Sequence, residues 1–411
     1  MINLKRITYV TLAFMIVAKT FFVSTEASGQ IIDNYTSKWK MPIHVGDKLW
    51  RELGSTSERM RECEIPNDII HKMSTPELLE NILDYPYIAL IGTYDNPLEG
   101  LDYLTERFNG LREFFTRDDY VDVALEKYES VTIPQKMKIE YEEIISEENY
   151  VHDMNELLQS EDEVLKTQIL EDAYITNMVN ALECILAKAE NNSIVNEDEK
   201  SRICETMVRL LQEKGKSEYY NYTSSSILAT DAYMLEQTID ISDKEFNLYS
   251  TQDGEYYIFY IKTRGGKNAE VWSYYDLTYN DYAYCYNLVA LYDEARVVER
   301  GYRENNCHAY AWLNTTSIAK EKNCHWLNTP SVFLDDSSYK KYEVAKSVNN
   351  IAYWKSGAHS ALVTIPSISV YDGKKNITTS EVISKWGTGP VVRHYVGDNY
   401  CPYTGEVIYF K

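Results

Sequence analysis

Apolar side chains recur every three or four residues through the first half of the chain, which is the spacing of amphipathic helices. The clearest example is residues 74–86, where we predict Thr75 as the cap, Pro76 at the first helical position and Pro86 as the stop. The same spacing returns in four further segments, residues 96–131, 140–163, 169–190 and 195–215. We therefore predict an all-helical domain over residues 66–252.

The pattern changes near residue 253, where apolar and polar residues begin to alternate and Tyr, Ile and Val become frequent. Gly265 and Gly266 separate two such runs, which is typical of a hairpin turn. One more helix is expected around residues 279–291, and short strands are expected in residues 295–302, 351–366, 381–389 and 391–396. The sequence thus predicts an α+β fold, in which residues 253–411 form a second domain around a small antiparallel sheet.

The first residues read as a secretory signal. Lys5 and Arg6 precede an apolar run, and small residues follow at Ala27, Ser28 and Gly29, where a signal peptidase cuts. An uncleaved membrane anchor is the alternative, but Lys19 interrupts the run well short of the roughly 20 residues that span a bilayer. We predict a signal peptide over residues 1–29, an N-terminal extension over residues 30–65, and a secreted, extracellular or cell-wall-associated protein without stable membrane insertion.

Acidic residues dominate the charge. The chain has 63 Asp and Glu against 41 Lys and Arg, a net charge of −22. Because no basic tract is present, affinity for nucleic acid has no source, and we predict no nucleic-acid partner. The acidic run in residues 140–163 lacks the spacing of a calcium loop and is read as a solvated helix face. The seven cysteines show no regular spacing, so a disulfide scaffold is not expected.

The candidate chemistry lies after residue 300, where four of the seven histidines fall. Asn305 and Asn306 are good caps, so the helix expected in "CHAYAWL" would begin with Cys307 in its first turn, where the backbone favours a thiolate. His359 stands at the start of the apolar strand in "AHSALVTI", with Ser360 pointing to the opposite face. A cysteine hydrolase needs such a thiol and a histidine from elsewhere in the fold.

Several motifs of this chain resemble, in the same order, those of a group of exported, largely uncharacterised bacterial proteins: "NNCHAYAW", "HWLNTPSVFLDDSSY", "AHSALV", "SKWGTGPVVRH" and "CPY". The C-terminal domain of that group is similar to the papain-like NlpC and CHAP peptidases and amidases of the cell wall. Residues 74–117 are similar to the helical region in front of that domain. The resemblance implies a papain-like C-terminal domain in which the helix carrying the cysteine packs on a small antiparallel sheet.

The resemblance also implies the roles of single residues. Cys307 would be the nucleophile and His359 the general base, with Ser384, Lys385 or His394 as the third member that orients the imidazole. The backbone N–H of Cys307 and the Asn306 side chain would form the oxyanion hole. The group predicted to line the substrate site comprises Asn306, His308, Trp312 and Trp386, although tryptophans at such positions are more often core. No cofactor and no metal are expected.

Two alternatives stay open. Cys307, His308, Cys324 and His325 could hold zinc in a structural domain, but zinc ligands within a pair usually stand two to four residues apart rather than side by side. A papain-like module could also bind peptide or glycan without cutting it. The predicted function is a secreted cysteine hydrolase whose partner is a peptide or cell-wall substrate, such as peptidoglycan stem peptides. The acidic charge would disfavour an anionic wall, which leaves proteins as the other substrate class.

Overall fold

The computed structural model describes twelve stretches of the chain: residues 39–94, 97–131, 149–190, 248–251, 254–274, 282–300, 305–313, 326–327, 330–356, 359–371, 375–387 and 389–411. Every described residue belongs to one compact unit, residues 37–411. The predicted signal peptide and the predicted domain boundary at residues 252–253 lie outside the described residues.

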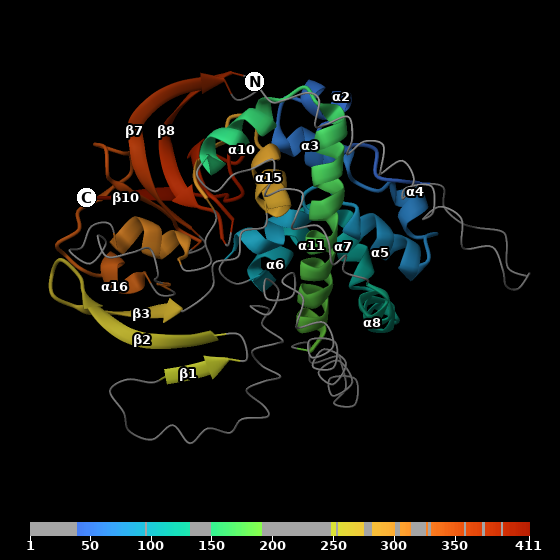
Figure 1. The fold of residues 1–411 in the computed structure, drawn as a ribbon, viewed down its shortest axis with the longest axis horizontal. Coiled ribbons are helices and arrows are strands. Elements are labelled where there is room, and N and C mark those ends of the chain that lie inside the picture. The colour runs from blue at the N-terminus through green and yellow to red at the C-terminus, as the bar shows by residue number, and fades with distance from the viewer. Residues whose placement is uncertain are drawn as a thin grey trace, which may run out of the picture. The chain divides into compact units, whose positions relative to one another are not determined.

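Helices fill the N-terminal half, as the apolar spacing predicts (Figure 1). In chain order they are α2 (Lys48–Glu52), α3 (Thr56–Glu62), α4 (Asn67–Ile70), α5 (Thr75–Leu83), the 3-10 helix η1 (Ile88–Thr93), α6 (Pro97–Arg107), α7 (Asn109–Phe114), α8 (Tyr120–Ser130), α10 (Tyr150–Gln159) and α11 (Glu163–Glu190). The long helix α11 contacts η1, α5, α6 and α8, so it is the centre of this helical layer. The helix predicted at residues 195–215 lies outside the described residues.

The start of α5 corrects the predicted cap. Ser74, not Thr75, is the N-cap: its side chain accepts a hydrogen bond from the Glu77 backbone, and the Glu77 carboxylate accepts one from the Ser74 backbone. This reciprocal capping box satisfies two backbone donors that the first turn leaves unpaired. Thr75 turns its hydroxyl instead to Asp119 at 2.6 Å, which joins α5 to the start of α8. Thr75 is therefore the first helical residue, and Pro76 is the second rather than the first.

Antiparallel strands occupy the C-terminal half, as predicted for an α+β fold. Among the described residues the elements are β1 (Leu248–Thr251), β2 (Gly254–Lys262), β3 (Asn268–Tyr274), α15 (Tyr282–Ala290), β4 (Arg296–Glu299), the π-helical turn η2 (Ala309–Leu313), α16 (Ser331–Leu334), β5 (Lys341–Tyr342), β6 (Ile351–Trp354), β7 (Ser360–Tyr371), β8 (Asn376–Lys385), β9 (Val391–Tyr395) and β10 (Val407–Phe410). Strands β1 to β3 form one sheet. The other seven pair in the order β4-β9-β8-β7-β6-β10-β5.

The predicted hairpin at Gly265 and Gly266 is confirmed. Strands β2 and β3 pair on either side of it, and Gly266 has a φ of +86°, a conformation that glycine adopts without strain. The carboxylate of Asp336, after α16, accepts hydrogen bonds from the backbone N–H of Gly265 and from the Thr263 hydroxyl. These contacts bind the hairpin turn to the segment that follows α16, and they hold the pKa of Asp336 well below its usual value.

The seven-stranded sheet separates two apolar clusters. Side chains alternate along β7, so Ala361 and Val363 enter the cluster that includes the helices, whereas Leu362 packs against the cluster built around Trp312 and Phe333. We call the first side the helical face and the second the η2 face. Trp354 and Tyr403 belong to the helical-face cluster. The helices and the sheet therefore share one core rather than two separate ones.

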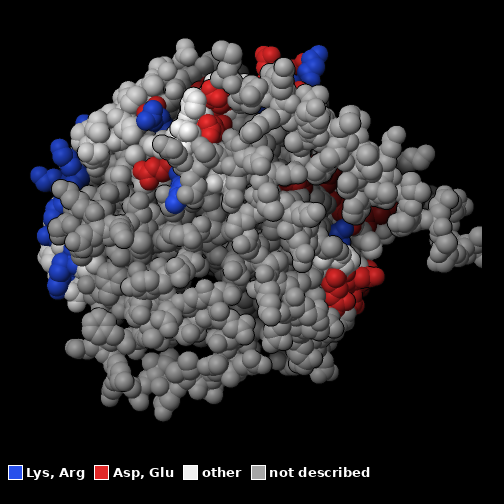
Figure 2. Space-filling model, in the orientation of Figure 1, with Lys and Arg blue, Asp and Glu red and all other residues white. Residues whose placement is uncertain are grey.

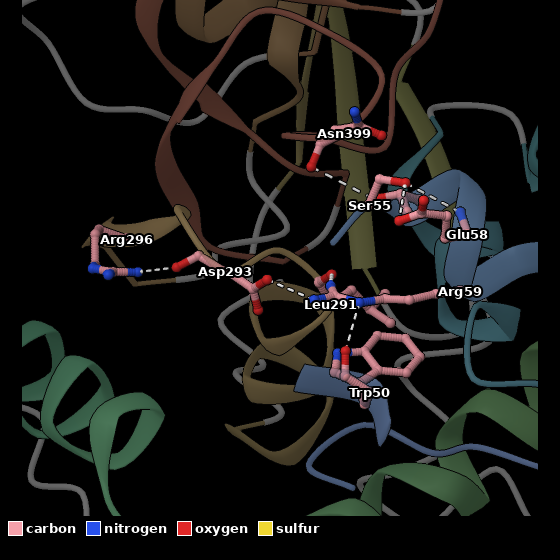
Figure 3. Close-up of polar contacts among 9 residues, drawn as sticks. Trp50, Ser55, Glu58, Arg59, Leu291, Asp293, Arg296 and Asn399 are labelled. Atoms are coloured by element: carbon pink, nitrogen blue, oxygen red, sulfur yellow. Dashed lines mark hydrogen bonds and ion pairs between the residues drawn. The ribbon is translucent and has the colours of Figure 1, made fainter. Parts of the chain in front are cut away.

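Arg59 on α3 links the first helices to the end of α15 (Figure 3). Its guanidinium is 3% exposed, donates to the carbonyls of Trp50 at 3.0 Å and Leu291 at 3.4 Å, and pairs with Asp293 at 2.6 Å. It also lies 4.9 Å from the centre of the Trp50 ring. This single side chain thus ties together segments that are 232 or more residues apart in sequence.

Charge is unevenly spread over the described surface. Lys and Arg atoms gather along one side in Figure 2, the side on which Figure 1 marks the C-terminal end of the chain. Exposed Lys340, Lys341 and Lys346 lie in or beside β5, an edge strand of the large sheet. Lysines on an edge strand oppose pairing with another chain. Within the described residues, no helix combines the length and the apolar character that crossing a membrane requires.

Candidate functional site

Cys307 lies in the first turn of the helical segment that continues into η2, as its capping asparagines predict. Asn306 caps this turn: its Oδ1 accepts hydrogen bonds from the N–H of Ala309 at 2.9 Å and of Leu327 at 3.2 Å. Its Nδ2 donates to the Leu327 carbonyl at 3.2 Å. The buried Asn306 amide therefore holds the turn and the segment at Leu327 together. The oxyanion role predicted for this side chain stays a prediction.

The Cys307 turn is fastened to the start of β7. Ser360, which is fully buried, shares a 2.8 Å hydrogen bond with Nδ1 of His308 and accepts a 3.0 Å hydrogen bond from Nε1 of Trp312. Both partners lie on the helical segment that begins at Cys307, so Ser360 joins it to the residue next to His359. The predicted site residues His308 and Trp312 thus hold the turn in place, and Trp312 is also part of the η2-face core.

His359 precedes β7 and faces the helical side of the sheet. Its ring stacks on Tyr403 with 3.4 Å between centroids and meets Trp354 edge-on at 4.9 Å. Both ring nitrogens are buried and have no hydrogen-bond partner among the described residues. Burial lowers the pKa of His359 well below its ordinary value, and the nearby His394 and His308 lower it further. The imidazole is therefore neutral at neutral pH and is not hydrogen-bonded to the Cys307 thiol.

The three candidates for the orienting residue are engaged elsewhere. His394 donates from Nδ1 to the Tyr395 carbonyl at 2.9 Å, so its Nε2 accepts from the Ser384 hydroxyl at 2.7 Å. The ammonium of Lys385 donates to the carbonyls of Gly387 and Gly389. The His394 ring centroid lies 6.4 Å from that of His359. Burial lowers the pKa of His394 to about 4.

The other predicted substrate-site tryptophan, Trp386, is fully buried on the helical face, where its ring lies 5.4 Å from His394 and 5.5 Å from Tyr292. It belongs to the shared core of helices and sheet. Trp386 and Trp312 therefore lie on opposite faces of the sheet, and neither has more than a trace of exposed surface.

One residue of the site was missed by the sequence analysis. Tyr353 on β6 pairs directly with Ser360 on β7, packs on the η2-face cluster, and has its ring centre 6.3 Å from that of His308. Burial raises the pKa of Tyr353, and charge on the nearby Cys307 thiol raises it further. The alternation along the four residues of β6 predicts which side chains share a face of the sheet. It does not predict which face the Cys307 turn contacts.

The structure describes only two of the four ligands that the zinc alternative requires. Cys307 and His308 are described, whereas Cys324 and His325 lie outside the described residues. Within the described part of the chain, no group of three or more His, Cys, Asp and Glu side chains is arranged to hold a metal ion.

Comparison with known proteins gives no relative: no family model, no curated protein and no solved structure matches the chain. The resemblance to papain-like wall hydrolases stays a prediction. What the geometry adds to it is a specific arrangement of Cys307, Ser360 and Tyr353 on one face of the sheet.

Proposed function

We propose that the chain is a cysteine hydrolase of papain-like architecture that cleaves an amide or peptide bond, with Cys307 as nucleophile and His359 as general base. The observation that carries the proposal is the pair of hydrogen bonds that Ser360 makes with His308 and Trp312. They fasten the turn that begins at Cys307 to the residue that follows His359. The turn that carries the Cys307 thiol therefore lies against the start of β7, next to His359 in sequence, although the His359 ring packs on Tyr403 on the helical face of the sheet.

The electrostatics support a base rather than an acid in the resting protein. A neutral imidazole can accept the thiol proton, and burial with two neighbouring histidines keeps His359 neutral. Proton transfer from Cys307 requires the His359 ring to leave its stack on Tyr403 and turn from the helical face towards the η2 face of the sheet. The third member of the site stays open among Ser384, Lys385 and His394. Of these, His394 has its ring 6.4 Å from that of His359.

The substrate class is proposed from the predicted signal peptide and the resemblance, which favour peptidoglycan stem peptides outside the cell. The test is incubation of purified sacculi with the wild-type protein and with Cys307→Ala, followed by mass analysis of the released fragments. We expect muropeptides cut at an amide bond from the wild type only. Equal release by both proteins would exclude wall cleavage by Cys307, and a parallel digestion of denatured proteins would then test the other substrate class.

A papain-like binding module without turnover is the second candidate. It is favoured by the position of His359, whose ring is packed against Tyr403 and makes no hydrogen bond to the described residues. Iodoacetamide at slightly acidic pH separates the two functions, because only an activated thiolate reacts quickly there. The hydrolase predicts that Cys307 is alkylated much faster than Cys184, a buried thiol whose pKa burial raises, and that His359→Ala slows Cys307 alone. Equal rates at Cys307 and Cys184 would support the binding module.

A further inference from the structure

Five side chains meet around the Cys307 turn on the η2 face of the sheet: Asn306, Cys307, His308, Ser360 and Tyr353. Four of them have 3% or less of their surface exposed, while Tyr353 is only half-buried. Tyr353 is therefore the member of this group that a molecule arriving from solvent can touch. Its pairing with Ser360 and its ring contacts with His308 and Phe410 hold it next to the residue that follows Cys307.

Most hydrogen-bonding side chains around the Cys307 turn already have partners. The Asn306 amide donates to the Leu327 carbonyl, and the Trp312 indole donates to Ser360. Ser360 itself is engaged by both His308 and Trp312. The Tyr353 hydroxyl, in contrast, makes no hydrogen bond to any described residue. It is a polar donor near the candidate nucleophile that the fold leaves available.

We propose that Tyr353 is a catalytic residue whose hydroxyl donates a hydrogen bond to the oxyanion formed when Cys307 attacks a carbonyl. This inference rests on the proposed hydrolase function. A phenol O–H near the Cys307 turn stabilises the negative charge that develops on the carbonyl oxygen, two bonds from the sulfur, and such donors act most strongly where water is excluded. The electrostatic coupling between Tyr353 and Cys307 agrees with this placement.

The step balances without any further reactant. The Cys307 thiolate forms a C–S bond with the carbonyl carbon, and the π electron pair moves to the carbonyl oxygen, which accepts a hydrogen bond from Tyr353. Tyr353 keeps its proton throughout. The electron pair then returns to re-form C=O as the C–N bond breaks, and the leaving amine takes the proton that His359 received from Cys307. Water later hydrolyses the thioester.

Two small reagents separate an oxyanion donor from a group that acts on the thiol. p-Nitrophenyl acetate acetylates a thiolate through a tetrahedral oxyanion and releases p-nitrophenolate. Iodoacetamide alkylates the same thiolate by displacement at carbon, with no oxyanion. Both rates at Cys307 are measured by mass spectrometry of the labelled peptide in wild type, in Tyr353→Phe, and in Tyr342→Phe. Tyr342 is a half-buried tyrosine on β5 of the same sheet and is the matched control.

Tyr353→Phe is expected to slow acetylation about 100-fold while alkylation changes by less than about threefold, as for removal of one oxyanion-hole donor. Tyr342→Phe is expected to leave both rates unchanged. If Tyr353→Phe slows both reactions in parallel, or slows neither, Tyr353 is not an oxyanion donor although Cys307 can still be a nucleophile. If wild-type Cys307 reacts no faster than Cys184 with either reagent, the hydrolase proposal fails, and the role of Tyr353 fails with it.

Discussion

His394 is expected to make the fold sensitive to acid. The side chain is fully buried on the helical face of the sheet, accepts a hydrogen bond from Ser384, and is held neutral by burial, which lowers its pKa from 6.5 to about 4. In the unfolded chain the same imidazole returns to the ordinary histidine pKa. At a pH between these two pKa values, the imidazole is protonated in the unfolded state but not in the native state. Stability is therefore lost as the pH falls from 6.5 towards 4.

The size of this loss follows from the two pKa values. Between about pH 7.5 and about pH 5, protonation of one histidine in the unfolded state alone lowers the free energy of unfolding by about 2 kcal/mol. His359, whose pKa burial also lowers, adds to the loss in the same direction. His44 acts in the opposite direction, because its hydrogen bond with Asp84 raises its pKa, so acid stabilises that contact.

Comparison of variants isolates the contribution of His394 from these other groups. The measurement is urea unfolding of wild type, His394→Gln and His152→Gln at both pH values. Glutamine keeps an acceptor for the Ser384 hydroxyl but does not titrate. His152 is the control, because its side chain is 70% exposed on α10. We expect His394→Gln to lose about 2 kcal/mol less stability than wild type on acidification, while His152→Gln follows wild type.

An equal loss in wild type and His394→Gln, within about 0.5 kcal/mol, would contradict the reasoning. It would mean that His394 has the same pKa in the native and the unfolded states, and that burial does not exclude water from its imidazole. The same experiment on His359→Gln then reports whether the other buried imidazole accounts for the acid sensitivity.

Three further predictions concern stability and are measured by chemical or thermal unfolding. Arg59→Leu should cost about 3 kcal/mol because two buried carbonyls lose their donor, whereas Asp293→Asn should cost less than about 1 kcal/mol because Asp293 is 64% exposed; equal costs would refute this ranking. Gly387→Ala should cost more than about 3 kcal/mol, since φ is +53° and an added Cβ would meet the Gly92 carbonyl oxygen; a near-neutral variant would show that the turn can shift. Asn306→Ala should cost about 3 kcal/mol by orphaning two backbone donors, and Asn306→Asp should recover part of it because the acceptor remains.

Periodicity predicted the elements well where one face of each is buried. The apolar stripe of α5 and the alternation around the hairpin at Gly265 and Gly266 both correspond to elements of the structure. The cap of α5 was predicted one residue too late, because Ser74 and Thr75 both have hydroxyls that can cap a helix. Only the reciprocal contact of Ser74 with Glu77 distinguishes them.

The site was harder to predict than the elements around it. Alternation indicated that His359 and Ser360 point to opposite faces, but it did not indicate that the Cys307 turn would pack on the Ser360 face. That choice is made by the packing of Trp312 and Phe333, which belong to segments far from β7 in sequence. Tyr353 was not predicted for the same reason, because its place near Cys307 depends on the packing of the η2 turn on that face of β6.

The hydrogen bond from the Tyr403 hydroxyl to the Thr93 carbonyl, which joins residues 310 positions apart, has a consequence for how the chain folds. The helices are synthesised first, yet the core they bury includes Trp386, which follows β8, and Tyr403, which lies between β9 and β10. Until Tyr403 emerges, η1 lacks this partner at Thr93, and contacts of such sequence separation form late and slowly. The helical half therefore completes its packing only after the C-terminal residues are synthesised. A chain truncated before Tyr403 is expected to remain aggregation-prone.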